Sequence, residues 1–227
     1  MTVTQLDVSR HFELFDPYSF DTPIHIIGVG ATGSWLALSL AKLGITNIHI
    51  WDFDTVEEHN IPNQAFSIAD VGKAKVKALF DQIKFMTGTE VIPHNEKVER
   101  QRFAGIVFCM VDSMEGRRTI WENCGKMKSQ VKLWVEPRMG LEVGRVYTVN
   151  PMDYTHIQKY EDTWYGDDVA EVSACGNSMT VINACLAIAS WVTRQLITFV
   201  NDGMDELDNE ILFDFKYNNI FPTRWSA

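Results

Sequence analysis

Three glycines with the spacing Gly-x-Gly-x-x-Gly, at Gly28, Gly30 and Gly33, separate a short apolar run from a segment with apolar residues at helical spacing. This spacing allows a tight turn, lets a phosphate approach the backbone, and leads into a helix whose unpaired N–H groups attract an anion. Asp52 ends the next apolar run, about 20 residues further on, where a carboxylate can accept from ribose hydroxyls. The pattern predicts a nucleotide-binding turn, but alone it does not distinguish NAD from ATP.

Four further polar residues favour chemistry at a phosphate. Lys75 lies near the start of a predicted helix, and Asn60 and Gln64 carry neutral amides that can bond phosphate or ribose. Asp112 follows an apolar run and can bind Mg²⁺ through its oxygens. Phosphoryl chemistry requires neutralisation of negative charge, whereas hydride transfer does not. The alternatives are a solvated helix lysine for Lys75 and a helix N-cap for Asp112.

Strands that alternate with helices between residues 24 and 127 predict an α/β fold with a largely parallel, Rossmann-like sheet flanked by helices. Ligands bind beyond the carboxyl ends of such strands. Gly28, Asp52 and Asp112 all follow strand ends, so we expect them to share one site. The predicted strands are 24–28, 48–51, 90–93, 106–111, 131–136, 144–149 and 211–217, and the predicted helices are 32–42, 73–86, 117–127 and 179–200.

Composition is that of an ordinary globular protein. The chain has 227 residues, 46% of them hydrophobic and 22% charged, and its length suits one domain. Its net charge of -10 disfavours nucleic acids and anionic membranes. We find no basic-then-apolar leader and no apolar run of about 18 residues, so we expect a cytoplasmic protein. None of the four cysteines forms a CxxC pair, so no zinc site is expected.

The ordered series from Gly28 to Asp112, including the stretch Gly-Lys-Ala-Lys-Val at 72–76 and followed by Arg117, resembles the ThiF/MoeB-type adenylyltransferases, bacterial relatives of ubiquitin-activating enzymes. The resemblance covers roughly residues 10–150. It implies ATP-dependent activation of a carboxylate with release of pyrophosphate. The implied substrate is the C-terminus of a small ubiquitin-like or sulfur-carrier protein, and the implied assembly is a homodimer.

The resemblance also implies roles for individual residues. The three glycines would cradle the nucleotide, and Asp52 would bind ribose. Asn60 and Gln64 would contact the nucleotide, and Lys75 would pair with its phosphates. Asp112 would serve both Mg²⁺ and the reaction.

Two arginines of the family need separate treatment. One lies upstream of the glycine loop and acts across a dimer interface, and Arg10 is the candidate for it, with an exposed arm residue as the alternative. The other precedes a glutamine, and here Asn63 stands in its place before Gln64. Because Asn63 lacks the positive charge, the substitution puts the reaction rate in doubt, and loss of one such donor can cost about 10²–10³ in rate.

Some relatives transfer the activated partner to a cysteine. Cys175, in a loop of small and polar residues before the long apolar segment, is the candidate for a thioester, and a small loop residue is the alternative. Cys185 is expected in the core and Cys109 within a strand, so both should be inert. Cys124, on a predicted helix, is uninformative.

The domain organisation expected is a single adenylation domain. Residues 1–21 would form an N-terminal arm and 22–150 the nucleotide-binding core, and 151–227 would hold a crossover loop, a buried helix and a C-terminal strand and helix extension. The aromatic-rich stretch Tyr154–Tyr165 would be that crossover loop, with ordinary surface packing as the alternative, and 179–200 would be a well-buried helix.

Other functions stay open at this point. A NAD-dependent oxidoreductase would explain the glycines and Asp52 but not Asn60, Lys75 or Asp112. A nucleotide-binding scaffold without catalysis would explain Asn63. Activation of a carboxylate on a modified tRNA base is disfavoured by the acidic charge.

Overall fold

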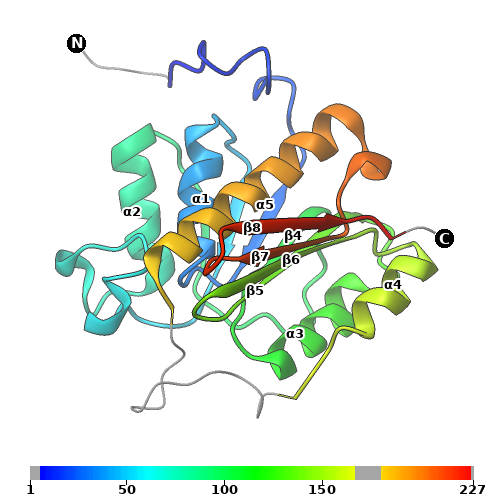
Figure 1. Cartoon of the computed structure of the whole chain (residues 1–227). Coiled ribbons are helices and arrows are strands. Elements are labelled where there is room, and N and C mark those ends of the chain that lie inside the picture. The colour runs from blue at the N-terminus through cyan, green and yellow to red at the C-terminus, as the bar shows by residue number, and fades with distance from the viewer. Residues whose placement is uncertain (1–5, 167–179, 226–227) are drawn as a thin grey trace.

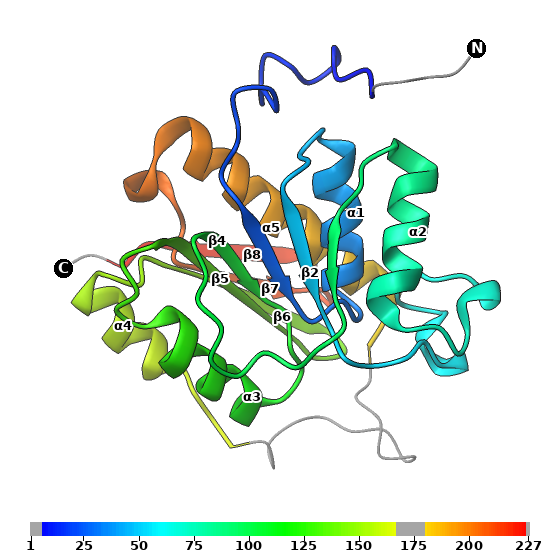
Figure 2. The same cartoon turned by 180° about the vertical axis from the view of Figure 1, so that it is seen from behind.

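The computed structural model describes residues 6–166 and 180–225. In this part of the chain one mixed sheet of eight strands, in the order β3-β2-β1-β4-β5-β6-β7-β8, runs through the molecule with helices on both faces (Figures 1 and 2). The first five strands are parallel, and β6 to β8 continue the sheet in antiparallel fashion. The α/β prediction is confirmed, but the sheet is parallel only in its first five strands.

The strands follow the apolar runs of the sequence closely. β1 and β4 are buried along their whole length because both faces of a parallel sheet are covered. A last strand, β8, was not predicted, because its exposed residues show no burial pattern. The strands are β1 Ile24–Ile27, β2 Ile48–Trp51, β3 Ile92–His94, β4 Gly105–Cys109, β5 Val131–Met139, β6 Val143–Val149, β7 Glu210–Asp214 and β8 Asn219–Thr223.

Helices divide between the two faces of the sheet. One face carries α1 Gly33–Lys42, α2 Lys75–Thr87 and α5 Ile182–Asp202, packed over a core that includes Ile26, Ile50 and Phe108. The other face, turned toward the viewer in Figure 2, carries α3 Met114–Ile120, the π-helical turn Trp121–Gly125 and α4 Tyr154–Glu161. Short 3-10 turns cover Glu58–Asn60, Ile68–Asp70 and Met204–Glu206.

Two predicted elements differ from the structure. The stretch Tyr154–Tyr165 is not a loop: it begins with α4, whose N-cap Asp153 accepts from the backbone N–H of His156 at 3.0 Å. Tyr160 of this helix is fully buried against the sheet. α5 is buried on one face only, and Leu186 on its other face is 44% exposed, so the prediction of a well-buried helix was wrong there.

The N-terminal arm packs at the amino edge of the sheet, where the parallel strands begin (Figure 1). His11 Nε2 lies 3.2 Å from the carbonyl oxygen of Leu43, just past the end of α1. The carbonyl of Leu14 accepts from Asn201 near the end of α5 at 2.8 Å. The arm therefore joins the ends of two helices on one face of the sheet. None of the described helices is both long and apolar enough to cross a membrane.

Candidate functional site

The glycine loop forms the turn between β1 and α1 at the carboxyl edge of the sheet. Gly28 has a φ of +89°, and a Cβ on it would lie 2.9 Å from the carbonyl oxygen of Met110. A Cβ on Gly33 would lie 2.0 Å from the carbonyl oxygen of Gly28. A Cβ on Gly30 would meet nothing closer than the amide nitrogen of Gln64 at 3.9 Å. Gly28 and Gly33 are therefore required by packing, whereas Gly30 exposes its backbone to open space.

Asp52 follows β2 and lies directly beside this loop. Its Oδ2 accepts from the backbone N–H of Val29 at 2.8 Å, and its Oδ1 accepts from the backbone N–H of Asp54 at 2.9 Å. The residue is 8% exposed. Each carboxylate oxygen retains acceptor capacity, because an ionised carboxylate offers about four lone-pair sites. The buried anion is thus positioned by the loop that it faces.

The segment 60–65 is held against the same loop by two side chains of α1. Ser34 Oγ donates to the carbonyl of Gly30 at 2.7 Å and accepts from the backbone N–H of Ala65 at 3.0 Å. The indole of Trp35 donates to the carbonyl of Asn63 at 3.0 Å. Asn60 is buried, and its Oδ1 accepts from the backbone N–H of Glu57 at 2.9 Å. Asn60 therefore shapes the turn that brings Gln64 opposite Gly30.

Lys75 is nearly buried, which overturns the alternative of a solvated lysine. Its ammonium group pairs with Asp54 Oδ2 at 3.0 Å, and its side chain is 10% exposed. Asp54 is two residues beyond Asp52, so the pair stands next to the predicted ribose position. The cation lies at the carboxyl edge of the sheet and is paired with an acid of the protein.

Asp112 lies exposed between the end of β4 and the start of α3. It is not the N-cap: that position belongs to Ser113, whose Oγ accepts from the backbone N–H of Gly116 at 3.2 Å. Asp112 has no hydrogen bond or ion pair with any residue of 6–166 or 180–225 in the structure. Its carboxylate is therefore available to a ligand at the carboxyl edge.

Asn63, in place of the family arginine, makes a long-range contact. Its side-chain Nδ2 donates to the hydroxyl of Thr180, two residues before α5 begins. Its Oδ1 is buried without a hydrogen-bond partner in the described chain, and so is Oε1 of Gln64. Asn63 therefore links the residues just before α5 to segment 60–65, and the side-chain amide of Gln64 lies near Gly30.

Arg10 and the cysteines lie elsewhere. Arg10 is exposed in the arm at the amino edge, so the structure does not bring it to the site of its own chain. Cys175 lies outside the described residues. Burial raises the pKa of Cys109 to about 12 and those of Cys124 and Cys185 to about 11, so these three are poor nucleophiles at neutral pH.

These residues fit ATP. The open backbone at Gly30 borders α1, whose N-cap Thr32 makes no side-chain capping bond and whose first turn holds no acid. Such a helix start suits a phosphate. The described residues contain no group of three metal ligands. Mg²⁺ commonly binds through one carboxylate, water and the phosphates of its nucleotide, so a lone Asp112 is compatible with it.

Two functional candidates, Glu136 and Arg138, were missed by the sequence-based prediction, and so was the ion pair of Arg117 with Glu136. All lie beneath the site, where Glu136 is fully buried and the two arginines are at most 7% exposed. The available signal was a glutamate and an arginine two residues apart within an otherwise apolar run, since charged side chains are rarely buried unpaired.

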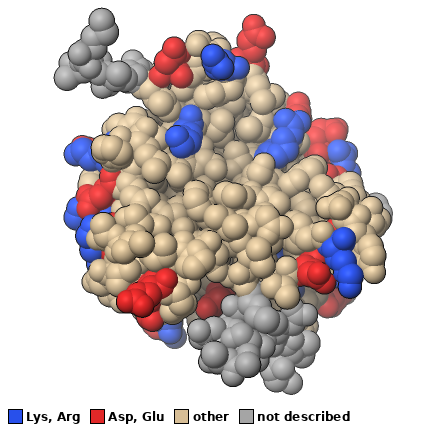
Figure 3. All heavy atoms as spheres, turned by 60° about the vertical axis from the view of Figure 1, so that its left-hand side comes forward, with Lys and Arg blue, Asp and Glu red and all other residues tan. Residues whose placement is uncertain are grey.

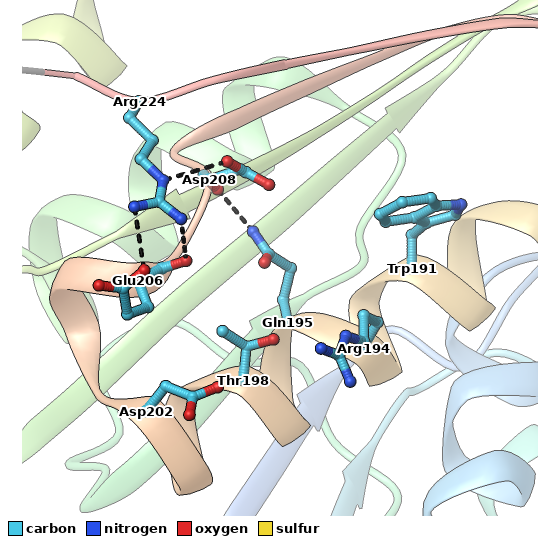
Figure 4. Close-up of a pocket in the computed structure, with 8 residues that line it drawn as sticks. All are labelled: Trp191, Arg194, Gln195, Thr198, Asp202, Glu206, Asp208 and Arg224. Atoms are coloured by element: carbon cyan, nitrogen blue, oxygen red, sulfur yellow. Dashed lines mark hydrogen bonds and ion pairs between the residues drawn. The ribbon is translucent and has the colours of Figure 1, made fainter.

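A separate pocket of about 590 Å³ lies along the C-terminal half of α5, away from the glycine loop (Figure 4). Arg224 bonds there to Glu206 and Asp208, and Gln195 donates to the carbonyl of Asp208. Its polar groups are largely satisfied by one another, so we do not assign it to the reaction. Its lining residues are Trp191, Arg194, Gln195, Thr198, Asp202, Glu206, Asp208 and Arg224.

Known proteins resemble this chain in both sequence and structure. It is 36% identical over 108 residues to the NEDD8-activating enzyme E1 catalytic subunit of Caenorhabditis elegans, which covers 44% of this chain and 25% of that protein. It is 41% identical over 59 residues to the probable adenylyltransferase/sulfurtransferase MoeZ of Mycobacterium tuberculosis, covering 26% of this chain and 15% of MoeZ.

Solved structures share the fold. Escherichia coli MccB with MccA-N7isoASN superposes with a TM-score of 0.72 at 15% identity, covering 91% of this chain and 65% of MccB. The aligned part of this chain thus spans about a quarter of the NEDD8-activating subunit and about two thirds of MccB. The ThiF family model matches residues 20–224, which include the glycine loop, Asp52, Lys75 and Asp112. By this match the chain belongs to the ThiF family.

Proposed function

We propose that the protein is an ATP-dependent adenylyltransferase that activates a carboxylate. The observation that carries the proposal is the open backbone of Gly30 beside the buried carboxylate of Asp52 and the uncapped start of α1. A triphosphate requires donors and a ribose requires acceptors, and this edge of the sheet offers both. E. coli MccB, a structural relative, has been solved with ATP.

In the proposed reaction a carboxylate oxygen attacks the α-phosphorus of ATP. A bond forms between them, the bond from the α-phosphorus to the bridging oxygen breaks, and pyrophosphate leaves. Lys75 would exchange its bond with Asp54 for a phosphate oxygen and so offset charge as two anions approach. Asp112 would hold Mg²⁺, which neutralises phosphate charge when bound.

The substrate we propose is the C-terminal carboxylate of a small ubiquitin-like or sulfur-carrier protein, acting in the cytoplasm. The support is the sequence likeness to a NEDD8-activating subunit and to an adenylyltransferase/sulfurtransferase. A peptide is the variant suggested by MccB, which has been solved with MccA.

We further propose a homodimer. Because Arg10 lies at the amino edge, it can serve only the site of another copy. A wide face over α1 and α5 shows almost no charged side chains (Figure 3), and Leu186 is exposed on α5. Light scattering should give the mass of a dimer for the wild type and of a monomer for Leu186→Glu. A monomeric wild type would contradict this part.

Isothermal titration tests which nucleotide the protein binds. ATP with Mg²⁺ and, separately, NAD⁺ are titrated into the wild type and into Asp52→Ala. We expect ATP binding that Asp52→Ala abolishes, with no heat from NAD⁺. ATP–pyrophosphate exchange with candidate carriers then tests catalysis, and Asp112→Ala should abolish it. If NAD⁺ binds and ATP gives no heat of binding, the proposal is wrong and an oxidoreductase is favoured.

A second candidate is a nucleotide-binding scaffold with little catalysis. It is favoured by Asn63, which lacks the positive charge of the family arginine. The Nδ2 of Asn63 already donates a hydrogen bond to the hydroxyl of Thr180. Tight ATP binding without exchange for any carrier would support it, and carrier-dependent exchange would exclude it. Asn63→Arg separates the two further, because an added guanidinium should increase exchange only if the other groups are competent.

A further inference from the structure

A single buried carboxylate joins three elements below the site. Glu136 on β5 is fully buried, and its Oε1 accepts from Arg117 Nη1 at 2.9 Å and from Arg138 Nε at 2.5 Å. Its Oε2 accepts from the hydroxyl of Tyr160. Arg117 belongs to α3, Arg138 to β5 and Tyr160 to α4. Three elements of the α3 and α4 side of the sheet therefore meet at one side chain.

Strand register places this carboxylate level with the end of β4, three residues before Asp112. Phe108 of β4 pairs with Val135 of β5, so continuing the register sets Glu136 beside Cys109, the last residue of β4, and Arg138 beside Val111, which precedes Asp112. Arg117 also donates through Nη1 to the carbonyl of Pro137 at 2.6 Å, and its backbone N–H donates to the carbonyl of Ser113 at 3.1 Å. The first turn of α3 is thereby bound to the end of β5.

The same cluster holds the chain that leaves α4. Arg138 Nη1 donates to the carbonyl of Thr163 at 2.7 Å. Arg118, next to Arg117, donates to the carbonyl of Tyr165 at 2.8 Å and lies over the ring of Trp164. The segment 163–165 is thus fastened from both β5 and α3.

The charges of the cluster do not balance. Two guanidinium groups share one carboxylate, and Nε of Arg117 and Nη2 of Arg138 have no hydrogen-bond partner in the described chain. Burying charges is costly, and apolar residues of similar size often stabilise a fold more. The arrangement is better explained by the geometry that it imposes on α3 and on 163–165 than by stability.

We propose that Glu136 is the positioning residue for Asp112: its carboxylate, through Arg117, fixes the first turn of α3 at the carboxyl edge and, through Arg138, fixes residues 163–165 in register with it. The part that concerns Asp112 rests on the proposed adenylation function. Glu136 itself lies out of reach of ligands because it is fully buried.

Hydrogen exchange on the full-length protein tests the linkage without any substrate. Glu136→Gln keeps the shape but removes the charge, so exchange in 114–120 and in 161–166 should rise together by roughly tenfold or more. Arg138→Met leaves the pair of Arg117 with Glu136 intact, so it should loosen 161–166 and spare α3. It also removes one of two cations from the cluster, so it should fold even where Glu136→Gln does not.

Gln195→Met is the matched control for lost stability. Gln195 is buried on the opposite face, where it donates to Thr148 Oγ1 at 3.0 Å. It should not affect α3 selectively. The proposal would be overturned if Glu136→Gln raised hydrogen exchange uniformly along the chain, with a rise in α3 no greater than that in Gln195→Met. Loosening of α3 by Arg138→Met to the same extent would overturn it as well.

Titration of ATP with Mg²⁺ or with EDTA tests the consequence for Asp112. Glu136→Gln should lose the Mg²⁺-dependent part of ATP affinity, about tenfold, and keep the part measured in EDTA, which depends on Asp52. Equal losses under both conditions would contradict positioning of Asp112. If the wild type shows no Mg²⁺ dependence, the proposed role of Asp112 fails and the exchange data alone decide whether Glu136 couples α3 to 163–165.

Discussion

Asp52 Oδ2 accepts a hydrogen bond from the backbone N–H of Val29 at 2.8 Å, so the acid that follows β2 holds the glycine loop in place. The same carboxylate is the predicted ribose acceptor. Asp52→Asn should fold, because its amide oxygen can still accept from Val29, but ATP affinity should fall by about 10- to 100-fold through loss of a charge-assisted bond. Titration calorimetry measures this, and unchanged affinity would show that ribose does not bind there.

Gly30 and Gly33 form a matched pair for separating binding from folding. Gly30→Ala adds a methyl group with 3.9 Å of clearance, so its stability should stay within about 1 kcal/mol of wild type while ATP affinity falls. Gly33→Ala drives the same group to within 2.0 Å of a carbonyl oxygen and should lower Tm markedly. Thermal unfolding and ATP titration on both variants check this. Similar ATP affinity in Gly30→Ala and wild type would place the phosphates elsewhere.

Because Lys75 is paired with Asp54, substitutions of the two residues should change ATP affinity in opposite directions. Lys75→Met should weaken ATP binding by about 10- to 100-fold, because a charge-assisted bond to phosphate is lost. Asp54→Asn removes the competing anion and should strengthen it. If both substitutions weaken binding equally, the pair serves structure and the ammonium group does not move to a phosphate.

Three histidines on neighbouring strands predict acid sensitivity. Burial, then the nearby His49, lowers the pKa of His25 to about 4, and burial also lowers the pKa values of His49 and His94. His49 Nδ1 and His94 Nε2 lie 3.0 Å apart, and among the described residues the acid Glu96 acts against the shift by raising the pKa of His94.

An unfolded histidine titrates near pH 6.5, so the native state binds fewer protons below that value. Stability should therefore fall as pH drops from about 6.5 to 4, by about 3 kcal/mol for His25 alone. Urea unfolding at several pH values measures the slope. His25→Phe should reduce the slope of unfolding free energy against pH. Titration of carboxylates contributes equally to both proteins, so it cancels when the two slopes are subtracted. An equal slope in His25→Phe would contradict the assignment.

The four cysteines should differ in reactivity. Burial raises the pKa values of Cys109, Cys124 and Cys185, so none of them should react quickly with a thiol reagent in the native protein. Any rapid reaction then belongs to Cys175, and Cys175→Ser should remove it. Rapid labelling that persists in Cys175→Ser would show that one of the buried thiols is accessible.

The sequence by itself determined the core of the fold and the edge of the sheet at which Gly28, Asp52 and Asp112 lie. Buried parallel strands are continuous apolar runs, and Gly28 and Gly33 mark a turn in which a larger residue would clash, as the 2.0 Å approach at Gly33 shows. Carboxyl ends of parallel strands share one edge, so the positions of Gly28, Asp52 and Asp112 could be inferred together.

Only the tertiary structure decided what those residues contact. The pairing of Lys75 with Asp54 spans 21 positions, the tether from Asn63 to Thr180 spans 117, and local spacing contains no information on such contacts. The exposed face of α5 is apolar, so composition alone could not distinguish it from core. The role of Glu136 was also beyond local sequence patterns. A buried charge is tolerated only where partners distant in the sequence surround it, and those partners come together only when the chain folds.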